Sequence, residues 1–295
     1  MENMKNKDIQ SEYQSYKKNE KALNAINRYN IKLTISGDIL TVAEFARVNQ
    51  KASCVKKLKN QQWLNTKTGE IFNAKSENRN NNIQKSMSML RDIVNTNCTE
   101  PNNLHWITLT YKNVVNDTKE LKKDFNYFIA RLNYYIENKL QVKKPEYITA
   151  IEPCEQNNRW HYHMILIWND KKPYIKNETL ADLWKHGFVK IQAVDNVDNI
   201  GAYLSAYLTN TIDKQGKKNK GGRLHLYPPN MKFYRFSKGI KRPEIVWATS
   251  GQAKNITNEY GTSVYETLKT YRINEELIPI IYKQYNKKRN GSKIK

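Results

Sequence analysis

The sequence predicts an α+β fold in which helices flank a central antiparallel sheet of about five strands. Short runs of alternating or β-branched residues are separated by longer segments whose apolar residues recur at helical spacing. Two of the strand-like runs, Tyr147–Cys154 and Trp160–Trp168, are joined by a short polar turn, which is typical of an antiparallel hairpin. A hydrophobic content of 39% supports a buried core for these elements.

The chain is expected to contain three regions: a basic helical N-terminal region over 1–60, a main domain over 61–250, and a C-terminal extension with a basic tail over 251–295. The first region is polar and includes the basic run Lys51–Lys59. The main domain begins with Gln62–Phe72, which reads as a small hairpin because a Lys-Thr-Gly turn lies in its middle.

The remaining elements follow in an order that alternates helix and strand. A helix over Glu77–Val94 has an apolar stripe, and Asp117 begins a second helix as its N-cap. After the first helix we expect a strand at His105–Tyr111 and then the helix that begins at Asp117. The hairpin follows, and after it come a short helix at Leu180–Trp184, a strand at Phe188–Val194 and a helix at Val197–Thr209.

The charge balance points to a polyanionic partner. The chain has 50 Lys and Arg against 28 Asp and Glu, a formal net charge of +22. Such a surplus opposes folding by self-repulsion unless a polyanion neutralises it. Nucleic acid is the first candidate, and an anionic membrane surface is the second.

No apolar run is long enough to span a bilayer, and the first residues carry no secretory signal. The three cysteines form no Cys-x-x-Cys pair, which argues against a structural zinc finger. We therefore expect a cytoplasmic protein without a membrane partner.

A histidine pair lies on the second strand of the hairpin. His161 and His163 are two residues apart, so in a strand both imidazoles project from the same face. Glu152 on the preceding strand lies opposite His163 in one register and opposite His161 in another, and both registers keep it on that face. Glu155 lies in the turn or on the other face. Two histidines and a carboxylate predict a metal site, although the same set also describes a non-haem iron centre.

Two tyrosines on the last helix are candidate nucleophiles. Tyr203 and Tyr207 are four residues apart, beside the apolar stripe of that helix, so their hydroxyls project together. A divalent cation would polarise a phosphate for attack by such a phenol. With 19 tyrosines in the chain, the spacing alone favours two half-buried packing residues over nucleophiles.

Several segments together resemble the HUH-endonuclease replication initiators of rolling-circle plasmids, phages and integrated elements of Gram-positive bacteria. The resemblance runs from about Trp63 to Pro243 and is carried by WITLTYKN, IEPCEQNNRWHYHMIL, NIGAYLSAYLTN and GGRLHLYPPNMKFYR, among other segments. Each segment is weak alone, whereas their order and separations make a strong combined match.

The resemblance implies that His161, His163 and Glu152 bind Mg²⁺ or Mn²⁺ and that Tyr207 or Tyr203 is the nucleophile, with Tyr207 slightly favoured. It implies an enzyme that nicks one strand at a replication origin, forms a 5′-phosphotyrosine with a free 3′-OH, and later rejoins the strand. Single-stranded origin DNA and a host helicase acting in trans are the implied partners.

The sequence departs from the wider superfamily in two places. The lysine often found three residues after the catalytic tyrosine is replaced by Ala206 or Asn210, and Lys214 or a lysine of Lys217–Lys220 is a substitute. The hairpin turn is also one residue longer than usual, which leaves the choice between Glu152 and Glu155 open.

The segment Lys214–Pro243 combines basic and aromatic residues and contains no Asp or Glu. This mixture is typical of sites for single-stranded DNA, where phosphates are neutralised and bases stack on rings. The expected phosphate contacts are Arg223, Arg235, Lys238, Lys241 and Arg242, and the expected stacking residues are Tyr227 and Tyr234. A solvated basic loop followed by a strand with core aromatics is the alternative.

Three other functions compete with the initiator. A relaxase or transposase of a mobile element would use the same chemistry. A non-catalytic origin-binding protein would bind DNA without forming an adduct. An iron oxygenase is disfavoured by the net charge of +22 and by the lack of a cosubstrate-binding motif.

Overall fold

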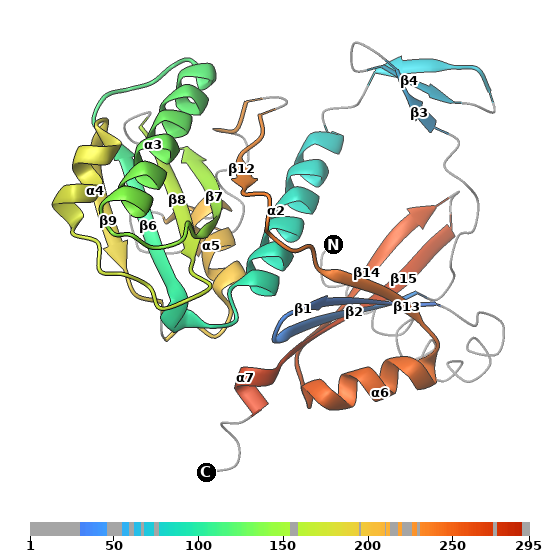
Figure 1. Ribbon diagram of the computed structural model, residues 1–295. Helices are drawn as coiled ribbons and strands as arrows, with labels where there is room; N and C mark the ends of the chain where they lie inside the picture. The colour runs from blue at the N-terminus through green and yellow to red at the C-terminus, as the bar shows by residue number, and fades with distance from the viewer. Residues whose placement is uncertain are drawn as a thin grey trace. The chain divides into compact units, whose positions relative to one another are not determined.

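The computed structural model describes residues 30–45, 55–58, 62–65, 68–73, 77–153, 159–194, 196–209, 211–212, 218–219, 226–228, 231–273 and 276–290. The chain forms two compact units (Figure 1). One contains the chain up to Asn78 together with the chain from Pro243, and the other contains Arg79–Arg242.

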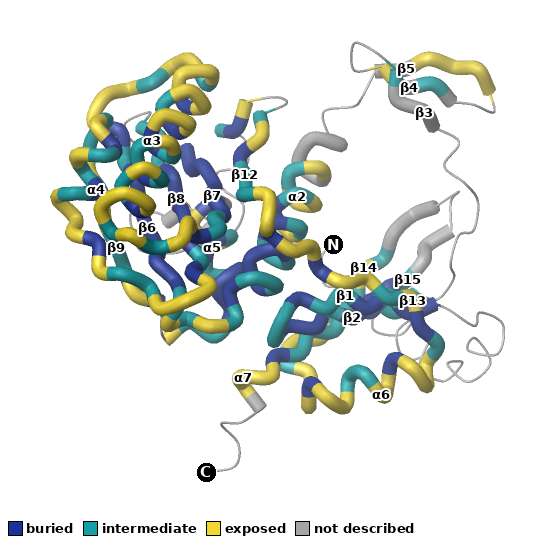
Figure 2. The backbone as a smooth tube through the Cα atoms, viewed as in Figure 1, coloured by how far each residue is buried: buried dark blue, intermediate teal, exposed yellow. Residues whose placement is uncertain are grey.

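The unit Arg79–Arg242 holds a five-stranded antiparallel sheet of order β12-β7-β8-β6-β9. Its strands are β6 (Leu104–Tyr111), β7 (Glu146–Pro153), β8 (Trp160–Ile167), β9 (Gly187–Gln192) and β12 (Tyr234–Phe236). This sheet and its flanking helices confirm the expected α+β fold. The central strands are almost continuously buried (Figure 2).

Four helices accompany this sheet: α2 (Glu77–Asn97), α3 (Thr118–Asn138), α4 (Asn177–Trp184) and α5 (Ile200–Thr209). A short 3₁₀ helix η1 (Pro101–Asn103) precedes β6, and the two-residue strands β10 (Thr211–Ile212) and β11 (Lys218–Asn219) pair with each other.

The N-cap of α3 is Asp117, as the sequence predicts, and its side chain accepts a hydrogen bond from the Lys119 backbone N–H at 2.8 Å. The predicted apolar stripe of α3 packs on the sheet: Phe125 lies 4.7 Å from the ring of Tyr162 on β8, measured between ring centroids. The Tyr162 hydroxyl donates to the Leu121 carbonyl at 2.8 Å. Because Tyr162 lies between the two histidines in the strand, α3 covers the face opposite to theirs.

The second unit contains another five-stranded antiparallel sheet, of order β13-β1-β2-β15-β14. Its strands are β1 (Ile31–Ser36), β2 (Ile39–Phe45), β13 (Glu244–Ala248), β14 (Ser263–Ile273) and β15 (Glu276–Asn286). Helix α6 (Ser250–Tyr260) covers one face, and the short α7 (Lys287–Asn290) follows β15. Three short strands, β3 (Val55–Lys57), β4 (Gln62–Asn65) and β5 (Ile71–Asn73), form a small sheet where a single hairpin is expected.

The expectation of a helical N-terminal region is wrong for 31–45, which form the hairpin β1–β2. Ile31, Leu33 and Ile35 alternate with polar residues, and Gly37 supplies the positive φ of 60° that a tight turn needs. This alternation was a readable strand signal. The structure also pairs β1 with β13, so residues from the two ends of the chain share one sheet.

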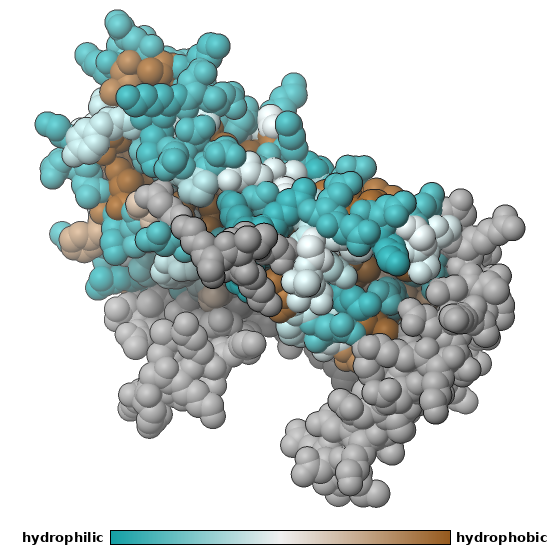
Figure 3. Space-filling view, turned by 90° about the horizontal axis from the view of Figure 1, so that it is seen from below, coloured by the Kyte–Doolittle hydropathy of each residue, from teal (hydrophilic) through white to brown (hydrophobic). Residues whose placement is uncertain are grey.

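Hydrophilic side chains dominate the described surface that Figure 3 shows, and hydrophobic ones form small separate patches on it. This distribution agrees with the large number of charged residues in the sequence. No helix in the described ranges combines the length and hydropathy needed to span a bilayer.

Candidate active site

His161 and His163 lie on β8 in the middle of the first sheet, and the register places both on one face. His163 is 4% exposed, while His161 is half-buried. A central strand therefore holds two polar imidazoles on the face of the sheet opposite to α3.

Glu152 on β7 pairs directly with His161, the second of the two registers that the sequence allows. Its side chain nevertheless reaches the other histidine: Glu152 Oε2 lies 2.5 Å from His163 Nε2. Glu152 is itself buried at 8% exposure, so this short contact lies out of bulk water. The competing Glu155 and the neighbouring Cys154 lie outside the described residues.

The histidines also contact two threonines that the sequence analysis did not single out. Thr110 Oγ1 on β6 lies 3.0 Å from His161 Nδ1, and Thr108 Oγ1 lies 3.4 Å from His163 Nδ1. Each threonine is the direct cross-strand partner of its histidine. When Nδ1 donates its proton to such a hydroxyl, Nε2 keeps its lone pair for ligation, as a metal-binding imidazole requires. Alternation in WITLTY marks these threonines as one face, but only the β6–β8 register assigns them to the histidines.

Helix α5 carries the two candidate nucleophiles. The Asn199 side chain caps the helix by accepting a hydrogen bond from the Ala202 backbone N–H at 2.9 Å. Gly201 faces α2 so closely that a Cβ there would overlap the Arg91 carbonyl oxygen. The Gly201 N–H donates to the side chain of Asn95 at 2.8 Å. The absence of a side chain at 201 thus lets α5 lie against α2.

Tyr203 and Tyr207 project together, as the helical spacing predicts, and their hydroxyl oxygens are 3.0 Å apart. Both rings pack against Trp106, with centroid distances of 5.2 Å for Tyr203 and 6.0 Å for Tyr207. The ring of Tyr207 also lies 5.1 Å from the ring of His163. Tyr207 is 37% exposed, so the structure brings an accessible phenol next to the histidine pair.

The surroundings of Tyr207 disfavour its ionised form. The hydrogen bond with Tyr203, burial and the nearby charge of Glu152 raise the pKa of Tyr207 to about 12. The phenol is therefore protonated at neutral pH. A nucleophilic Tyr207 needs a positive charge beside it, either from a cation or from a basic side chain.

The donor chemistry of the site fits a divalent cation. A carboxylate oxygen and an imidazole Nε2 converge, and a second imidazole projects from the same face. Within the described ranges, however, no group of three His, Cys, Asp or Glu side chains is gathered closely enough to form a ready-made metal site. Glu152 and His163 are the assembled pair, and His161, the cross-strand partner of Glu152, projects from the same face and would complete the set.

The expected DNA contacts lie in different surroundings. Lys238, Lys241 and Arg242 are exposed, and the Arg242 guanidinium lies 4.8 Å from the ring centroid of Phe236. Tyr234 is half-buried and pairs with Ala150, which places it on the histidine face. Arg223, Lys214, Lys217 and Lys220 lie outside the described residues.

Two of the expected DNA contacts have structural surroundings instead. Tyr227 is 1% exposed, contrary to its expected surface position, and its hydroxyl donates to the carbonyls of Ile151 and Leu208. Its ring fills the core, so we do not retain it as a stacking residue. Arg235 lies 4.5 Å from the ring centroid of Phe125 and donates to Asn126, which makes it part of the α3–sheet contact.

The edge strand β9 adds two residues that the sequence analysis missed. Phe188 pairs with Thr110 and Lys190 pairs with Thr108, so both lie on the histidine face. Phe188 is 68% exposed, and Lys190 is also exposed. An exposed ring and an ammonium group beside the site have the chemistry to hold a base and a phosphate.

Two further histidines have structural partners. His105 is buried at 8% exposure, and its Nδ1 accepts a hydrogen bond from Trp168 Nε1 at 3.1 Å. Burial, followed by the charge of Lys172, lowers the pKa of His105 to about 4. His186 contacts Asp124 and the ring of Trp184. His225 lies outside the described residues.

Residues 104–212 match a family model described as replication-associated protein ORF2. That range begins with β6 and includes both histidines, Glu152, Tyr203 and Tyr207. The search of curated proteins and the search of solved structures found no match. Over residues 104–212, the chain is therefore similar to this family of replication-associated proteins.

Proposed function

We propose that this replication-associated protein is a rolling-circle initiator that cuts one DNA strand by attack of a tyrosine. The observation that carries the proposal is the meeting of Tyr207, His163 and Glu152. The Tyr207 and His163 rings are 5.1 Å apart, and the His163–Glu152 contact is 2.5 Å long. A phenol next to a buried imidazole–carboxylate pair suits phosphoryl transfer better than it suits structural packing alone.

His163, His161 and Glu152 would hold Mg²⁺ or Mn²⁺. When bound, such a cation polarises the scissile phosphate and stabilises the charge that develops during displacement. Carboxylate and phosphate oxygens suit either ion, and imidazole ligands favour Mn²⁺. The threonines of β6 would accept hydrogen bonds from the Nδ1–H groups of both imidazoles, which leaves the Nε2 lone pairs for ligation.

In the proposed reaction, the phenol of Tyr207 loses its proton and its oxygen bonds to the phosphorus of the scissile phosphate. The bond from phosphorus to the 3′ oxygen breaks, and that oxygen leaves as a free 3′-OH after taking up a proton. The 5′ end remains attached to the enzyme as a phosphotyrosine, which retains the bond energy. Attack by a 3′-OH reverses the step and rejoins the strand.

We propose that the single strand crosses the histidine face of the sheet. Phe188 and Lys190 border that face on β9, and Tyr234 borders it on β12. Lys238, Lys241 and Arg242 follow β12 and are exposed. A strand lying from one edge to the other would thus meet cations and rings on both sides of the tyrosine.

The test uses origin oligonucleotides labelled at the 5′ or the 3′ end, incubated with the protein and Mn²⁺. We expect a denaturation-resistant adduct that contains the 5′-phosphate side of the nick. Chelator and the substitution His163→Ala should each abolish it. Tyr134→Phe, which changes an exposed tyrosine of α3, is the matched control and should leave it intact.

Two results would contradict the proposal. Adduct formation in the double variant Tyr203→Phe/Tyr207→Phe would exclude both nucleophiles. Origin binding without any adduct from the wild-type protein would favour a non-catalytic origin-binding protein. An added, unlabelled strand end of unrelated sequence separates an initiator from a transposase, because the initiator should rejoin the labelled strand efficiently only to an end that carries the origin sequence.

A further inference from the structure

The sheet of the second unit has two chemically different faces. Helix α6 packs on one face through Ala253 and Tyr260, which contact a cluster containing Leu33, Leu40 and Val42. The cross-strand register assigns the other face, because directly paired residues lie on the same side of a sheet. We call the side away from α6 the open face.

Three rows of paired residues cross the open face. One row runs from β13 to β14 and consists of Ile245, Thr34, Thr41, Gln284 and Tyr265. The next row consists of Trp247, Lys32, Ala43, Tyr282 and Thr267. The third consists of Phe45, Ile280 and Lys269. These three rows therefore contain four aromatic rings and two lysines.

The rings at the two edges of the open face are accessible. Trp247 on β13 is 45% exposed and Tyr265 on β14 is 57% exposed. Phe45 lies 5.5 Å from the ring of Trp247, and the Lys269 ammonium lies 5.4 Å from the ring centroid of Tyr282. The open face therefore has a ring-to-ring contact at one edge and a contact between an ammonium group and a ring at the other.

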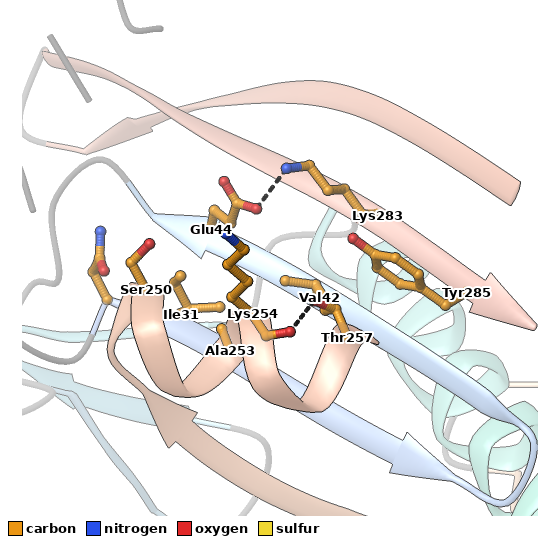
Figure 4. Close-up of a pocket in the computed structure, with 10 residues that line it drawn as sticks. Ile31, Val42, Glu44, Ser250, Ala253, Lys254, Thr257, Lys283 and Tyr285 are labelled. Atoms are coloured by element: carbon orange, nitrogen blue, oxygen red, sulfur yellow. Dashed lines mark hydrogen bonds and ion pairs between the residues drawn. The ribbon is translucent and has the colours of Figure 1, made fainter. Parts of the chain in front are cut away.

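The charge across these rows of the open face has one sign. Within these three rows, Lys32 and Lys269 are the charged residues, and none of the row residues is Asp or Glu. The acidic residues Glu44 and Glu266 project from the α6 side instead. There, a pocket of about 200 Å³ lies between α6 and the strands, and Glu44 accepts a hydrogen bond from Lys283 at 2.7 Å (Figure 4).

We propose that the open face is a second binding site, which takes single-stranded DNA through base stacking and phosphate contacts. Trp247 and Tyr265 would stack unpaired bases, while Lys32 and Lys269 neutralise phosphates and the threonine and amide side chains of the middle strands bond to bases and sugars. Stacking on rings is tolerant of sequence, so this site would hold DNA without reading it.

The charge argues for DNA and against a second copy of the chain as the occupant. Two copies meeting through these three rows would bring lysines against lysines without a carboxylate between them, which is unfavourable. A single DNA strand instead supplies phosphates for the lysines and flat bases for the rings, and it supplies both at every nucleotide.

This site does not depend on the tyrosine chemistry, and its test works in the absence of metal. Fluorescence anisotropy of a labelled oligothymidine in chelator measures the affinity of the full chain for single-stranded DNA. We expect Trp247→Ala/Tyr265→Ala to bind on the order of 100-fold more weakly, because two stacking contacts are lost and each is worth about tenfold. Trp247→Phe/Tyr265→Phe should restore most of the affinity.

The matched control is Tyr134→Ala/Tyr174→Ala, which removes two exposed rings from the other unit and should leave the affinity unchanged. Thermal unfolding and circular dichroism establish that each variant is folded. Equal affinity of the wild type and of folded Trp247→Ala/Tyr265→Ala overturns the proposal. An equal loss of affinity for single-stranded DNA in Trp247→Ala/Tyr265→Ala and in Tyr134→Ala/Tyr174→Ala overturns the proposal as well. The open face would then contribute no more to binding than any other pair of exposed rings.

The lysines have a separate readout. Lys32→Gln/Lys269→Gln should flatten the dependence of the logarithm of affinity on the logarithm of salt concentration, by about 0.7 per lysine. Lys254→Gln on α6 should leave that slope unchanged. At saturating DNA with Mn²⁺, the open-face variants should still form the covalent adduct. A protein that binds through this face but never forms an adduct would refute the proposed nicking and leave this site standing.

Discussion

Tyr203 and Tyr207 share a hydrogen bond of 3.0 Å between their hydroxyl oxygens, one helical turn apart on α5. The pair is asymmetric. Tyr207 is the tyrosine whose ring contacts His163, whereas Tyr203 meets Trp106 edge to face at 5.2 Å. The two phenols are therefore not interchangeable.

We predict that Tyr207→Phe abolishes adduct formation, while Tyr203→Phe changes its rate by less than about tenfold. Tyr207 has the position next to the histidines, and Tyr203 contributes one neutral hydrogen bond, worth on the order of 1 kcal/mol. Single-turnover rates of adduct formation with Mn²⁺ distinguish the two variants. The reverse order of the two rates would make Tyr203 the nucleophile.

The threonines of β6 should affect metal binding although they are not ligands. Thr108→Val and Thr110→Val remove the hydroxyls next to the Nδ1 atoms of His163 and His161. Loss of a group that hydrogen-bonds to a metal-ligating histidine typically weakens metal affinity by about 10- to 100-fold. We expect weakened Mn²⁺ binding by titration calorimetry, with recovery in the matching serine variants. Valine variants with unchanged Mn²⁺ affinity would show that the hydroxyls have no such role.

Phe188 should contribute to substrate binding. Phe188→Ala removes an exposed ring on the histidine face, and we expect KM for a single-stranded origin oligonucleotide to rise by about five- to tenfold with little change in kcat. Tyr174→Ala, at 81% exposure, is the control for loss of an exposed ring. A fall in kcat at constant KM would instead place Phe188 in the chemical step.

The stability of the unit Arg79–Arg242 should fall between about pH 6.5 and pH 4. The pKa of His105 is about 4 in the fold and near its ordinary value when unfolded, so the unfolded state binds the proton first as the pH falls. The loss amounts to at most about 3 kcal/mol. Denaturant unfolding at pH 7, 5.5 and 4.5 measures it. His105→Gln should reduce the dependence of the free energy of unfolding on pH.

Two glycine substitutions should have opposite effects on the free energy of unfolding. Gly201→Ala would force its Cβ against the Arg91 carbonyl, which must shift α5 or α2 at a cost of about 1–3 kcal/mol. Gly251→Ala in the first turn of α6 meets no atom within 4 Å and should stabilise its unit by about 0.5–1 kcal/mol. Because the α2–α5 contact places both tyrosines, Gly201→Ala should also slow adduct formation.

The sequence by itself determined the features that depend on neighbouring positions. Residues two apart on a strand share a face, which was enough to place His161 and His163 together, and residues four apart on a helix project together, which did the same for Tyr203 and Tyr207. The cap at Asp117 and the stripe of α3 were readable for the same reason, since each depends on local spacing alone.

Only the tertiary structure decided which strands become neighbours and in which register. It selected the register that pairs Glu152 with His161, brought Thr108 and Thr110 from more than 50 positions away to the histidines, and put Phe188 at the edge of their face. It also buried Tyr227 and joined Ile31 to Ala248 across most of the chain. These pairings depend on loop closure and on the packing of distant apolar surfaces, which no local periodicity encodes.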